Sequence, residues 1–238
     1  SIDVRAGESV CLYGLMGAGR TEMMECLAGR LPIMSGTVEL EGEDISKWSI
    51  GKRIERGLGL VPEDRQRDGL IQTQSVGNNM MLSSLWKMLK NGFLHFKTEK
   101  DRIKVGMTST RVKAASPNIL VTSLSGGNQQ KVAISRILLT DPRVILLDEP
   151  TRGIDVGAKA EIFALMRQQA EEGKAILFVT SEISEALTYS DRLIVMSRGK
   201  ISGQFETRHA KRDDVMSAAG ESVELVEEEL NEMGRLNN

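Results

Sequence analysis

A glycine-rich segment, GLMGAGRT at 14–21, brings together residues that can hold a phosphate group. Glycines lack a Cβ, so phosphate oxygens can approach the backbone N–H groups closely, and a helix starting there adds about half a positive charge. The hydroxyl of the final threonine is placed to bind Mg²⁺. The residues predicted to bind phosphate or metal here are Gly14, Leu15, Met16, Gly17, Ala18, Gly19, Arg20 and Thr21.

Position 20 departs from the usual phosphate-loop pattern, because Arg20 stands where a lysine is expected. The guanidinium keeps the positive charge but is a bulky planar fork, whereas a lysine ammonium is a compact point charge that fits inside such a loop. We therefore expect weaker or altered nucleotide binding at this loop, with slow hydrolysis.

Two carboxylates end the apolar run VILLDEP at 144–150. The carboxyl ends of strands in an α/β sheet are where ligands bind. Asp148 is predicted to hold Mg²⁺, and Glu149 to accept a proton from an attacking water. Pro150 and Gly153 also favour turns, so an exposed turn at the end of a strand is the alternative interpretation.

A second phosphate-binding pattern, LSGGNQQK at 124–131, opens a predicted helix. Ser125 fits an N-cap, and Gly126 and Gly127 add bare N–H groups and a helix dipole. Since the chain already contains one phosphate loop, this pattern is predicted to serve a nucleotide held by another domain. A helix start softened by glycines is the alternative.

The elements around these motifs alternate between short apolar runs and helical stretches, which predicts an α/β fold with a parallel sheet. Strands are expected at 9–14, 36–42, 57–62, 144–148 and in three runs after 174. Strand signals vanish between 63 and 140, which indicates a helical insert. We expect a core at 1–62 and 141–206, a helical subdomain with the second motif at 63–140, and an acidic tail at 207–238.

Composition is typical of a globular protein: 238 residues, 40% hydrophobic and 27% charged, with a net charge of −2. This balance offers no electrostatic case for binding nucleic acid. No apolar run approaches the ~20 residues of a membrane span, so a role at a membrane requires a partner. The sequence opens in mid-pattern and without Met, and we expect a longer native chain.

The order of GLMGAGRT, VPEDRQRDGL, LSGGNQQK and VILLDEPTRGIDVGAK resembles the ATP-binding subunits of ABC transporters. It is most similar to the second, C-terminal half of bacterial monosaccharide importers of the ribose, galactose and xylose type, over about residues 5–206. The resemblance implies a P-loop NTPase (RecA-like) core, a small antiparallel β part and a helical subdomain. It also implies ATP and Mg²⁺, with two halves holding ATP head to tail between one phosphate loop and the other half's signature.

The resemblance assigns further positions. The signature is Ser125 to Asn128, with Asn128 in place of the usual glutamine. Glu63 lies where the family has a coupling glutamine, and Ser181 where most members have a histidine that contacts the γ-phosphate. Asp155 belongs to a loop that contacts the other half.

Three of these positions, Arg20, Glu63 and Ser181, depart from the family pattern at the chain's own site. The resemblance therefore implies a degenerate own site, with Glu149, Ser181 and Glu63 at its catalytic positions. The signature, which completes the partner's site, is intact. A regulatory half that binds ATP without hydrolysing it is the alternative.

The implied partners are a second nucleotide-binding half fused upstream, transmembrane permease subunits and, indirectly, a periplasmic or extracellular solute-binding protein. The implied location is the cytoplasmic face of the cell membrane, as a peripheral subunit. The segment at 63–82 is expected to offer a docking surface for a cytoplasmic helix of the permease. An ABC ATPase that acts on ribosomes or DNA is a further alternative, but it requires a basic linker or a coiled-coil insert, and 63–123 contains neither.

Overall fold

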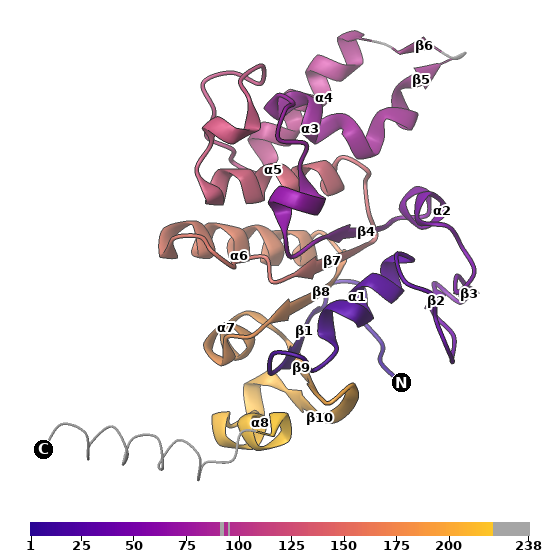
Figure 1. Cartoon of the computed structure of the whole chain (residues 1–238), viewed down its shortest axis with the longest axis vertical. Coiled ribbons are helices and arrows are strands. Elements are labelled where there is room, and N and C mark those ends of the chain that lie inside the picture. Colours follow the sequence, from indigo (N-terminus) through magenta and orange to yellow (C-terminus); the bar gives the residue numbers. More distant parts are fainter. Residues whose placement is uncertain (91–92, 95, 221–238) are drawn as a thin grey trace, which may run out of the picture. The chain divides into compact units, whose positions relative to one another are not determined.

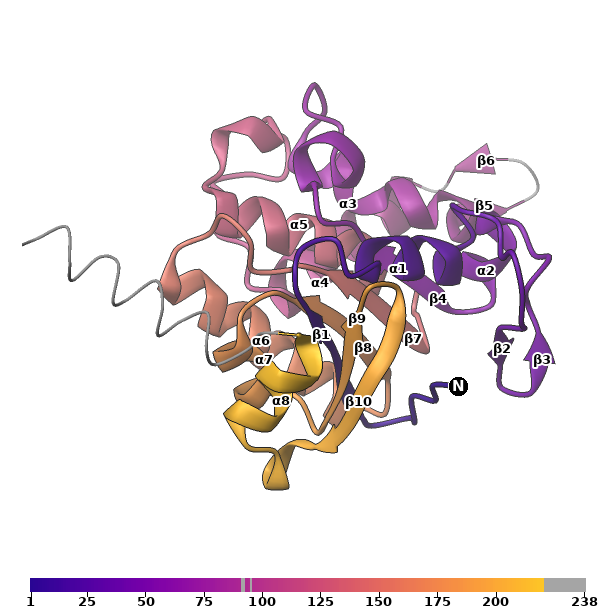
Figure 2. The same cartoon turned by 60° about the horizontal axis from the view of Figure 1, so that its bottom comes forward.

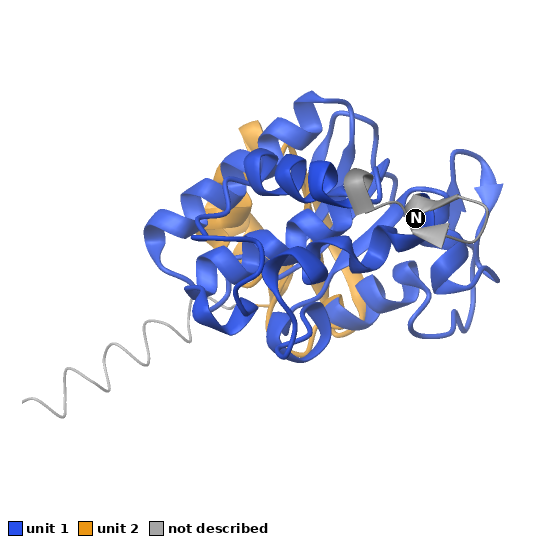
Figure 3. Ribbon diagram, turned by 90° about the horizontal axis from the view of Figure 1, so that it is seen from above, with its two compact units in different colours: residues 1–9, 21–178 blue, residues 10–20, 179–238 orange. Residues whose placement is uncertain are grey.

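The computed structural model describes residues 1–90, 93–94 and 96–220. The chain forms two compact units (Figure 3): unit 1 contains residues 1–9 and 21–178, and unit 2 contains residues 10–20 and the chain from 179. The predicted acidic tail lies outside the described residues from position 221 onward. Residues 14–20 of the phosphate loop thus belong to unit 2, whereas its last residue, Thr21, belongs to unit 1.

Unit 1 contains the strands β4 (Leu58–Val61), β7 (Val144–Asp148) and most of β8 (Ala175–Thr180). β4 and β7 pair in parallel, from Leu58 opposite Val144 to Val61 opposite Leu147, and β8 is the other neighbour of β7. The helices α1 (Arg20–Ala28), α2 (Ile50–Glu55) and α6 (Val156–Glu171) complete this part. Apart from the half-buried Val144, the apolar residues of β7 and β8 are buried, as expected of strands covered on both faces.

The strand predicted at 36–42 is much shorter than expected. Only β2 (Glu39–Leu40) forms, and it pairs antiparallel with β3 (Glu43–Asp44). The two residues between them, Glu41 and Gly42, have φ angles of 52° and 81°. These left-handed conformations turn the chain sharply, so the alternating pattern ends in a tight hairpin.

Residues 63–140 are mainly helical, as predicted. They form a π-helical turn η1 (Arg65–Gly69), α3 (Val76–Met81), a 3₁₀ segment η2 (Leu82–Met88), α4 (Phe96–Ser109), a short 3₁₀ turn η3 (Val121–Ser123) and α5 (Gly126–Leu138). Helices α3, α4 and α5 pack against one another (Figure 1). The antiparallel pair of β5 (Leu89–Lys90) and β6 (Phe93–Leu94) was not predicted, because two residues are too few to show a strand periodicity.

Unit 2 contains β1 (Ser9–Gly14) apart from its first residue, β9 (Arg192–Ser197) and β10 (Lys200–Glu206). β1 runs parallel to β9, whereas β10 pairs with β9 antiparallel. The helices are α7 (Ile183–Tyr189), a 3₁₀ turn η4 (Thr207–His209) and α8 (Arg212–Ala219). Figure 2 shows α8 lying against β9 and β10. The predicted strands at 9–14 and after 174 are confirmed.

The paired strands confirm an α/β fold with a mostly parallel sheet and a small antiparallel part. No helix among the described residues is long and apolar enough to cross a membrane. The division into a core at 1–62 and 141–206, a helical subdomain and a tail stays a prediction.

Candidate nucleotide site

The phosphate loop follows β1 in unit 2 and leads directly into α1, as the sequence predicts. Strand β1 ends at Gly14, where only glycine fits because an added Cβ would lie 2.4 Å from the carbonyl oxygen of Met196 on β9. The loop is closed by a hydrogen bond from the Ala18 N–H to the Leu15 carbonyl, at 3.1 Å. The Gly199 N–H donates to the Ala18 carbonyl at 3.0 Å. The loop is therefore held from the β9–β10 turn as well as from β1.

The Arg20 side chain does not simply replace a lysine. Its Nη1 donates a hydrogen bond to the Thr180 carbonyl, at 2.7 Å, at the end of β8. A charged donor bonded to a backbone carbonyl is a strong interaction, so part of the guanidinium is committed to the protein. This supports the expectation that position 20 acts differently from a phosphate-binding lysine.

Ser181 follows Thr180 directly and is exposed in unit 2. The turn that carries Ser181 is held by Thr180, whose hydroxyl donates to the Glu185 carboxylate at 2.7 Å and accepts from the Glu182 N–H at 3.1 Å. The hydrogen bond to the Thr180 carbonyl thus brings Arg20 next to the strand end that bears Ser181. Two of the three departures from the family pattern are linked in this way.

The acidic strand end lies in unit 1. Asp148 is the last residue of β7 and is 2% exposed. Glu149 has a φ of 44°, a left-handed conformation that is uncommon for a residue other than glycine. The Arg152 N–H closes the following turn on the Glu149 carbonyl at 3.1 Å. Such a conformation occurs in plain turns as well as at functional sites, so the catalytic role of Glu149 stays a prediction.

Two oxygen donors of unit 1 have the chemistry that Mg²⁺ prefers. Thr21 is half-buried at the start of α1, and Asp148 is a buried carboxylate. Mg²⁺ keeps several waters and is commonly bound by one or two protein oxygens together with substrate phosphates. The donor set predicted from the sequence therefore fits this ion.

Glu63, at the family's glutamine position, is engaged by its own chain. Its carboxylate forms an ion pair with the Arg152 side chain, in the turn after Glu149. The exposed fractions of the two side chains are 31% and 65%, so solvent screens this pair. The pair nevertheless ties the segment after β4 to the segment after β7.

Asp155 caps helix α6. Its carboxylate accepts a hydrogen bond from the Ala158 N–H at 2.9 Å, as a good N-cap does. The resemblance assigns Asp155 to a contact with the other half. In this structure its side chain caps α6 of its own chain.

The signature opens α5, and within it Ser125 is exposed, Gly126 and Asn128 are half-buried and Gly127 is buried. Ser125 is the exposed N-cap residue, but its side chain makes no capping hydrogen bond. Its Oγ instead accepts from Nδ2 of Asn128 at 3.1 Å, and Oδ1 of Asn128 accepts from the Lys113 N–H at 2.8 Å. The prediction of an N-cap is thus correct for the backbone and wrong for the side chain. The first N–H groups of α5 remain available to an anion, because a helix cannot satisfy them itself.

The helix that carries the signature is anchored to α6 by residues that the sequence analysis missed. Lys131 is 3% exposed, forms an ion pair with Glu161, and donates to the Arg111 carbonyl at 3.2 Å. The hydrogen bond and the charge of Lys131 lower the pKa of Glu161 below its ordinary value. Gly127 approaches α6 so closely that a Cβ would lie 2.4 Å from that of Ala158. No local pattern announces Lys131, because its partner is 30 residues away.

A second missed residue is Arg53, which holds the other end of α1. Its side chain is 2% exposed and donates to the carbonyls of Cys26 and Leu27, at 2.9 and 2.5 Å. These carbonyls lie in the last turn of α1, where a cation is favourable. The helix that begins at the phosphate loop is thereby capped by a buried arginine. Burial lowers the pKa of Arg53.

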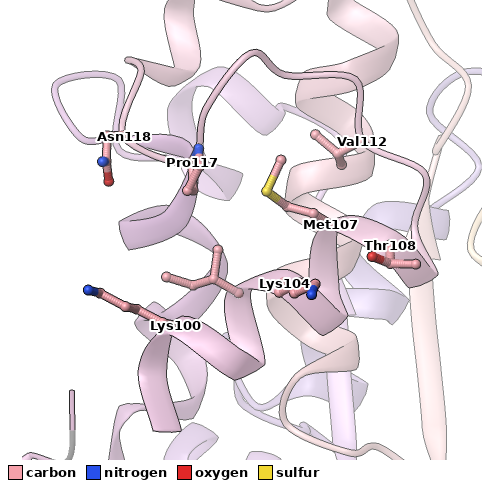
Figure 4. Close-up of a pocket in the computed structure, with 8 residues that line it drawn as sticks. Lys100, Lys104, Met107, Thr108, Val112, Pro117 and Asn118 are labelled. Atoms are coloured by element: carbon pink, nitrogen blue, oxygen red, sulfur yellow. The ribbon is translucent and has the colours of Figure 1, made fainter. Parts of the chain in front are cut away.

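The described residues also form a hollow of about 660 Å³ beside α4, which Figure 4 shows. Its apolar wall includes Met107, Val112 and Pro117, and Lys100 and Lys104 lie along its rim. No residue of the predicted nucleotide site lines it. The hollow is therefore separate from the motifs described above.

These motifs, in an α/β fold with a phosphate loop and a signature helix, define an ATP-binding cassette. A family model described as "ABC transporter" matches residues 1–152, which is more than half of the chain. The chain belongs to the ABC transporter family.

Curated relatives within this family are sugar-import proteins. The chain is 43% identical over 220 residues to the "Xylose import ATP-binding protein XylG" of Paraburkholderia xenovorans (strain LB400), covering 92% of this chain and 42% of that protein. It is 40% identical over 219 residues to the "Ribose import ATP-binding protein RbsA" of Geobacillus kaustophilus (strain HTA426), covering 92% and 44%. The chain thus spans less than half the length of these relatives.

Solved structures confirm the fold class. The dimeric post-hydrolysis state of the ATP-binding cassette MJ0796, bound to ADP and Pi, is similar with a TM-score of 0.76 and 24% identity, covering 88% of this chain and 89% of that one. A nucleotide-free ATP-binding cassette from an ABC transporter has a TM-score of 0.78 at 20% identity, covering 95% and 89%. At these identities the likeness shows the fold alone.

Proposed function

We propose that this chain is one ATP-binding half of an ABC importer for a monosaccharide or a related polyol. In this proposal its signature completes the ATP site of a second half, and its own site binds ATP but hydrolyses it poorly. The names of the relatives, which are import proteins for xylose and ribose, support the class of solute. That the chain matches less than half of their length supports a second half in the same protein.

The observation that carries the proposal is the presentation of the signature. The Ser125 hydroxyl is exposed and oriented by Asn128, at a helix start with uncapped N–H groups. The helix behind it is fixed to α6 by the buried Lys131. A rigid set of donors directed at a place where charge develops is what stabilises phosphoryl transfer.

The proposal assigns the following roles at the chain's own site. Glu149 would accept the proton of the attacking water, and Thr21 and Asp148 would hold Mg²⁺. When bound, Mg²⁺ would neutralise charge on the phosphate oxygens. Arg20 and Glu63 are both engaged by other groups of the chain, and each lost phosphate contact typically lowers a rate ~10²–10³-fold.

The proposal also includes the partners and the location. The segment at 63–82 would dock a cytoplasmic helix of the permease, which would hold the chain at the cytoplasmic face of the membrane. A solute-binding protein would act on the permease and contact this chain only indirectly. Arg67 is exposed, and a charge reversal there should weaken capture of the chain by the permease.

The test is the substitution Ser125→Ala in the complete protein with both halves. Removal of one oriented donor at the composite site should lower steady-state ATP turnover by about 10²-fold. Ser123→Ala, two residues upstream at another exposed serine, should leave turnover unchanged. Full turnover of Ser125→Ala would contradict the composite site.

A regulatory half that binds ATP without hydrolysing it is the second candidate. The commitment of Arg20 to Thr180 and of Glu63 to Arg152 favours it. Glu149→Gln separates the two candidates, because it removes the proposed base of the own site only. A fall in single-turnover hydrolysis at this site would support slow catalysis, and no change would support the regulatory half.

A further inference from the structure

Arg65 lies at the first position of η1 and reaches two functional segments of unit 1. Its Nη1 donates to the Arg152 carbonyl at 3.0 Å, in the turn that follows Glu149. Its Nη2 lies where a side chain on Gly126 would be, since an added Cβ there would be 2.9 Å away from it. The guanidinium therefore lies between the signature and that turn.

The other end of η1 is attached to the same helix. Arg136 of α5 donates to the Gly69 carbonyl at 2.8 Å and to the Ser83 hydroxyl at 2.7 Å. An added Cβ on Gly69 would lie 3.8 Å from the Ala133 side chain of α5. The segment after β4 thus contacts α5 at both ends, through Arg65 at the signature and through Gly69 further along.

The two carboxylates that precede Arg65 in the sequence form hydrogen bonds or ion pairs with other groups of the chain. Asp64 accepts from the N–H groups of Gln66 and Arg67, both at 3.0 Å, and Glu63 pairs with the Arg152 side chain. Within the described part of the chain, Arg65 forms no salt bridge, and its Nε is buried without a hydrogen-bond partner. The side chain contacts the Arg152 carbonyl and lies against Gly126, which belong to two different segments of unit 1.

We propose that Arg65 is a positioning residue for the signature, which links the segment after β4 to the first turn of α5. This inference rests on the proposed function, because it assumes that the signature completes an ATP site. In this proposal, a change in the conformation of residues 63–69 alters the position of the Ser125 hydroxyl, because the Arg65 guanidinium lies against the neighbouring Gly126. Loss of Arg65 leaves the donors present but displaced, and a displacement of about 1 Å can cost ~10²-fold in rate.

The experiment compares Arg65→Ala and Arg65→Lys with the matched control Arg56→Ala in the complete protein. Arg56 is an exposed arginine outside the motifs. We expect kcat to fall by about 10- to 10²-fold in both Arg65 variants, with little change in KM for ATP, because the phosphates are gripped by the other half. Lysine keeps the charge, but its single ammonium group cannot contact both the Arg152 carbonyl and Gly126, so Arg65→Lys should not restore kcat. Rescue by lysine, or a rise of KM with unchanged kcat, would overturn the inference.

A double-mutant cycle with Gly126→Ala makes the contact itself testable. The new methyl group meets Nη2 of Arg65, so its effect on kcat should be smaller once Arg65 is alanine. The loss in kcat of the double variant should be smaller than the product of the two single losses, whereas losses that multiply would overturn the inference. Full activity of Arg65→Ala together with an inactive Ser125→Ala would reject Arg65 but keep the proposed function. Activity of Ser125→Ala would reject both.

Discussion

The two motifs predicted to bind phosphate differ in what their polar groups contact. At the phosphate loop, the Arg20 guanidinium is bonded to the Thr180 carbonyl. At the signature, the contacts of Asn128 and Lys131 fix the backbone and leave the Ser125 hydroxyl exposed. At the phosphate loop the Arg20 guanidinium thus bonds to the protein itself, whereas at the signature the Ser125 hydroxyl is exposed to solvent.

This difference shows that a binding motif depends on the side chains behind it as well as on its own residues. A glycine loop followed by a helix is a phosphate site by its backbone, yet its charge can be turned to another acceptor. A helix start without a side-chain cap keeps its N–H groups available, provided that other contacts hold the helix.

The largest effect on stability is expected at the anchor of the signature helix. Glu161→Ala would leave the ammonium of Lys131, which is 3% exposed, without its carboxylate. The Glu161 side chain is 38% exposed and Lys131 keeps its bond to the Arg111 carbonyl, so the loss in the free energy of unfolding should be about 2 kcal/mol, less than for a fully buried pair. Urea denaturation of the purified protein measures it.

The control for this prediction is Glu171→Ala, at an exposed glutamate of the same helix. It should change the free energy of unfolding by less than about 0.5 kcal/mol. Equal effects of the two substitutions would mean that Lys131 is not the anchor of α5.

A smaller effect is expected at the phosphate loop. Arg20→Lys replaces the fork that bonds Thr180 with a compact charge suited to phosphate. We expect ATP affinity at this loop to rise about tenfold, equivalent to ~1.4 kcal/mol. Titration with a fluorescent ATP analogue measures the change. Unchanged affinity in the lysine variant would show that Arg20 does not limit binding.

A still smaller effect is expected for Glu63→Gln, which breaks the ion pair with Arg152. Because both side chains are partly exposed, the free energy of unfolding should fall by no more than about 0.5 kcal/mol. In high salt, which screens the ion pair, the difference in the free energy of unfolding between the wild type and Glu63→Gln should disappear. A fall of several kcal/mol in the free energy of unfolding would show that the pair stabilises more of the protein than the local turn.

The smallest effect concerns the pH dependence of the Lys131–Glu161 pair. The pKa of Glu161 is lowered from its ordinary value of 4.5, chiefly by the hydrogen bond and charge of Lys131. A lowered carboxyl pKa gives stability that is present above the unfolded-state pKa and is lost as the pH falls through the folded-state pKa. The stability difference between the wild type and Glu161→Gln should therefore be constant near neutral pH and narrow below about pH 4.5. A difference that stays constant down to pH 3 would contradict it.

The sequence by itself determined the α/β class, the buried strands and the positions of the motifs. The apolar runs at 9–14, 144–148 and 175–180 are buried strands, and the phosphate loop and signature each begin a helix where predicted. These features follow from local rules, because periodicity and glycine spacing act over a few residues. The prediction of a strand over 36–42 was wrong for a reason that is also local, because the turn at Glu41 and Gly42 ends the strand after Leu40.

Only the tertiary structure decided what the functional side chains contact. Arg20 meets Thr180 at a separation of 160 residues, Arg65 meets Arg152 at 87, and Lys131 meets Glu161 at 30. No periodicity reports such pairs, because they arise when the folded chain brings distant segments together. Whether a motif presents its polar groups or turns them inward depends on these contacts, and each of them exists only in the packed protein.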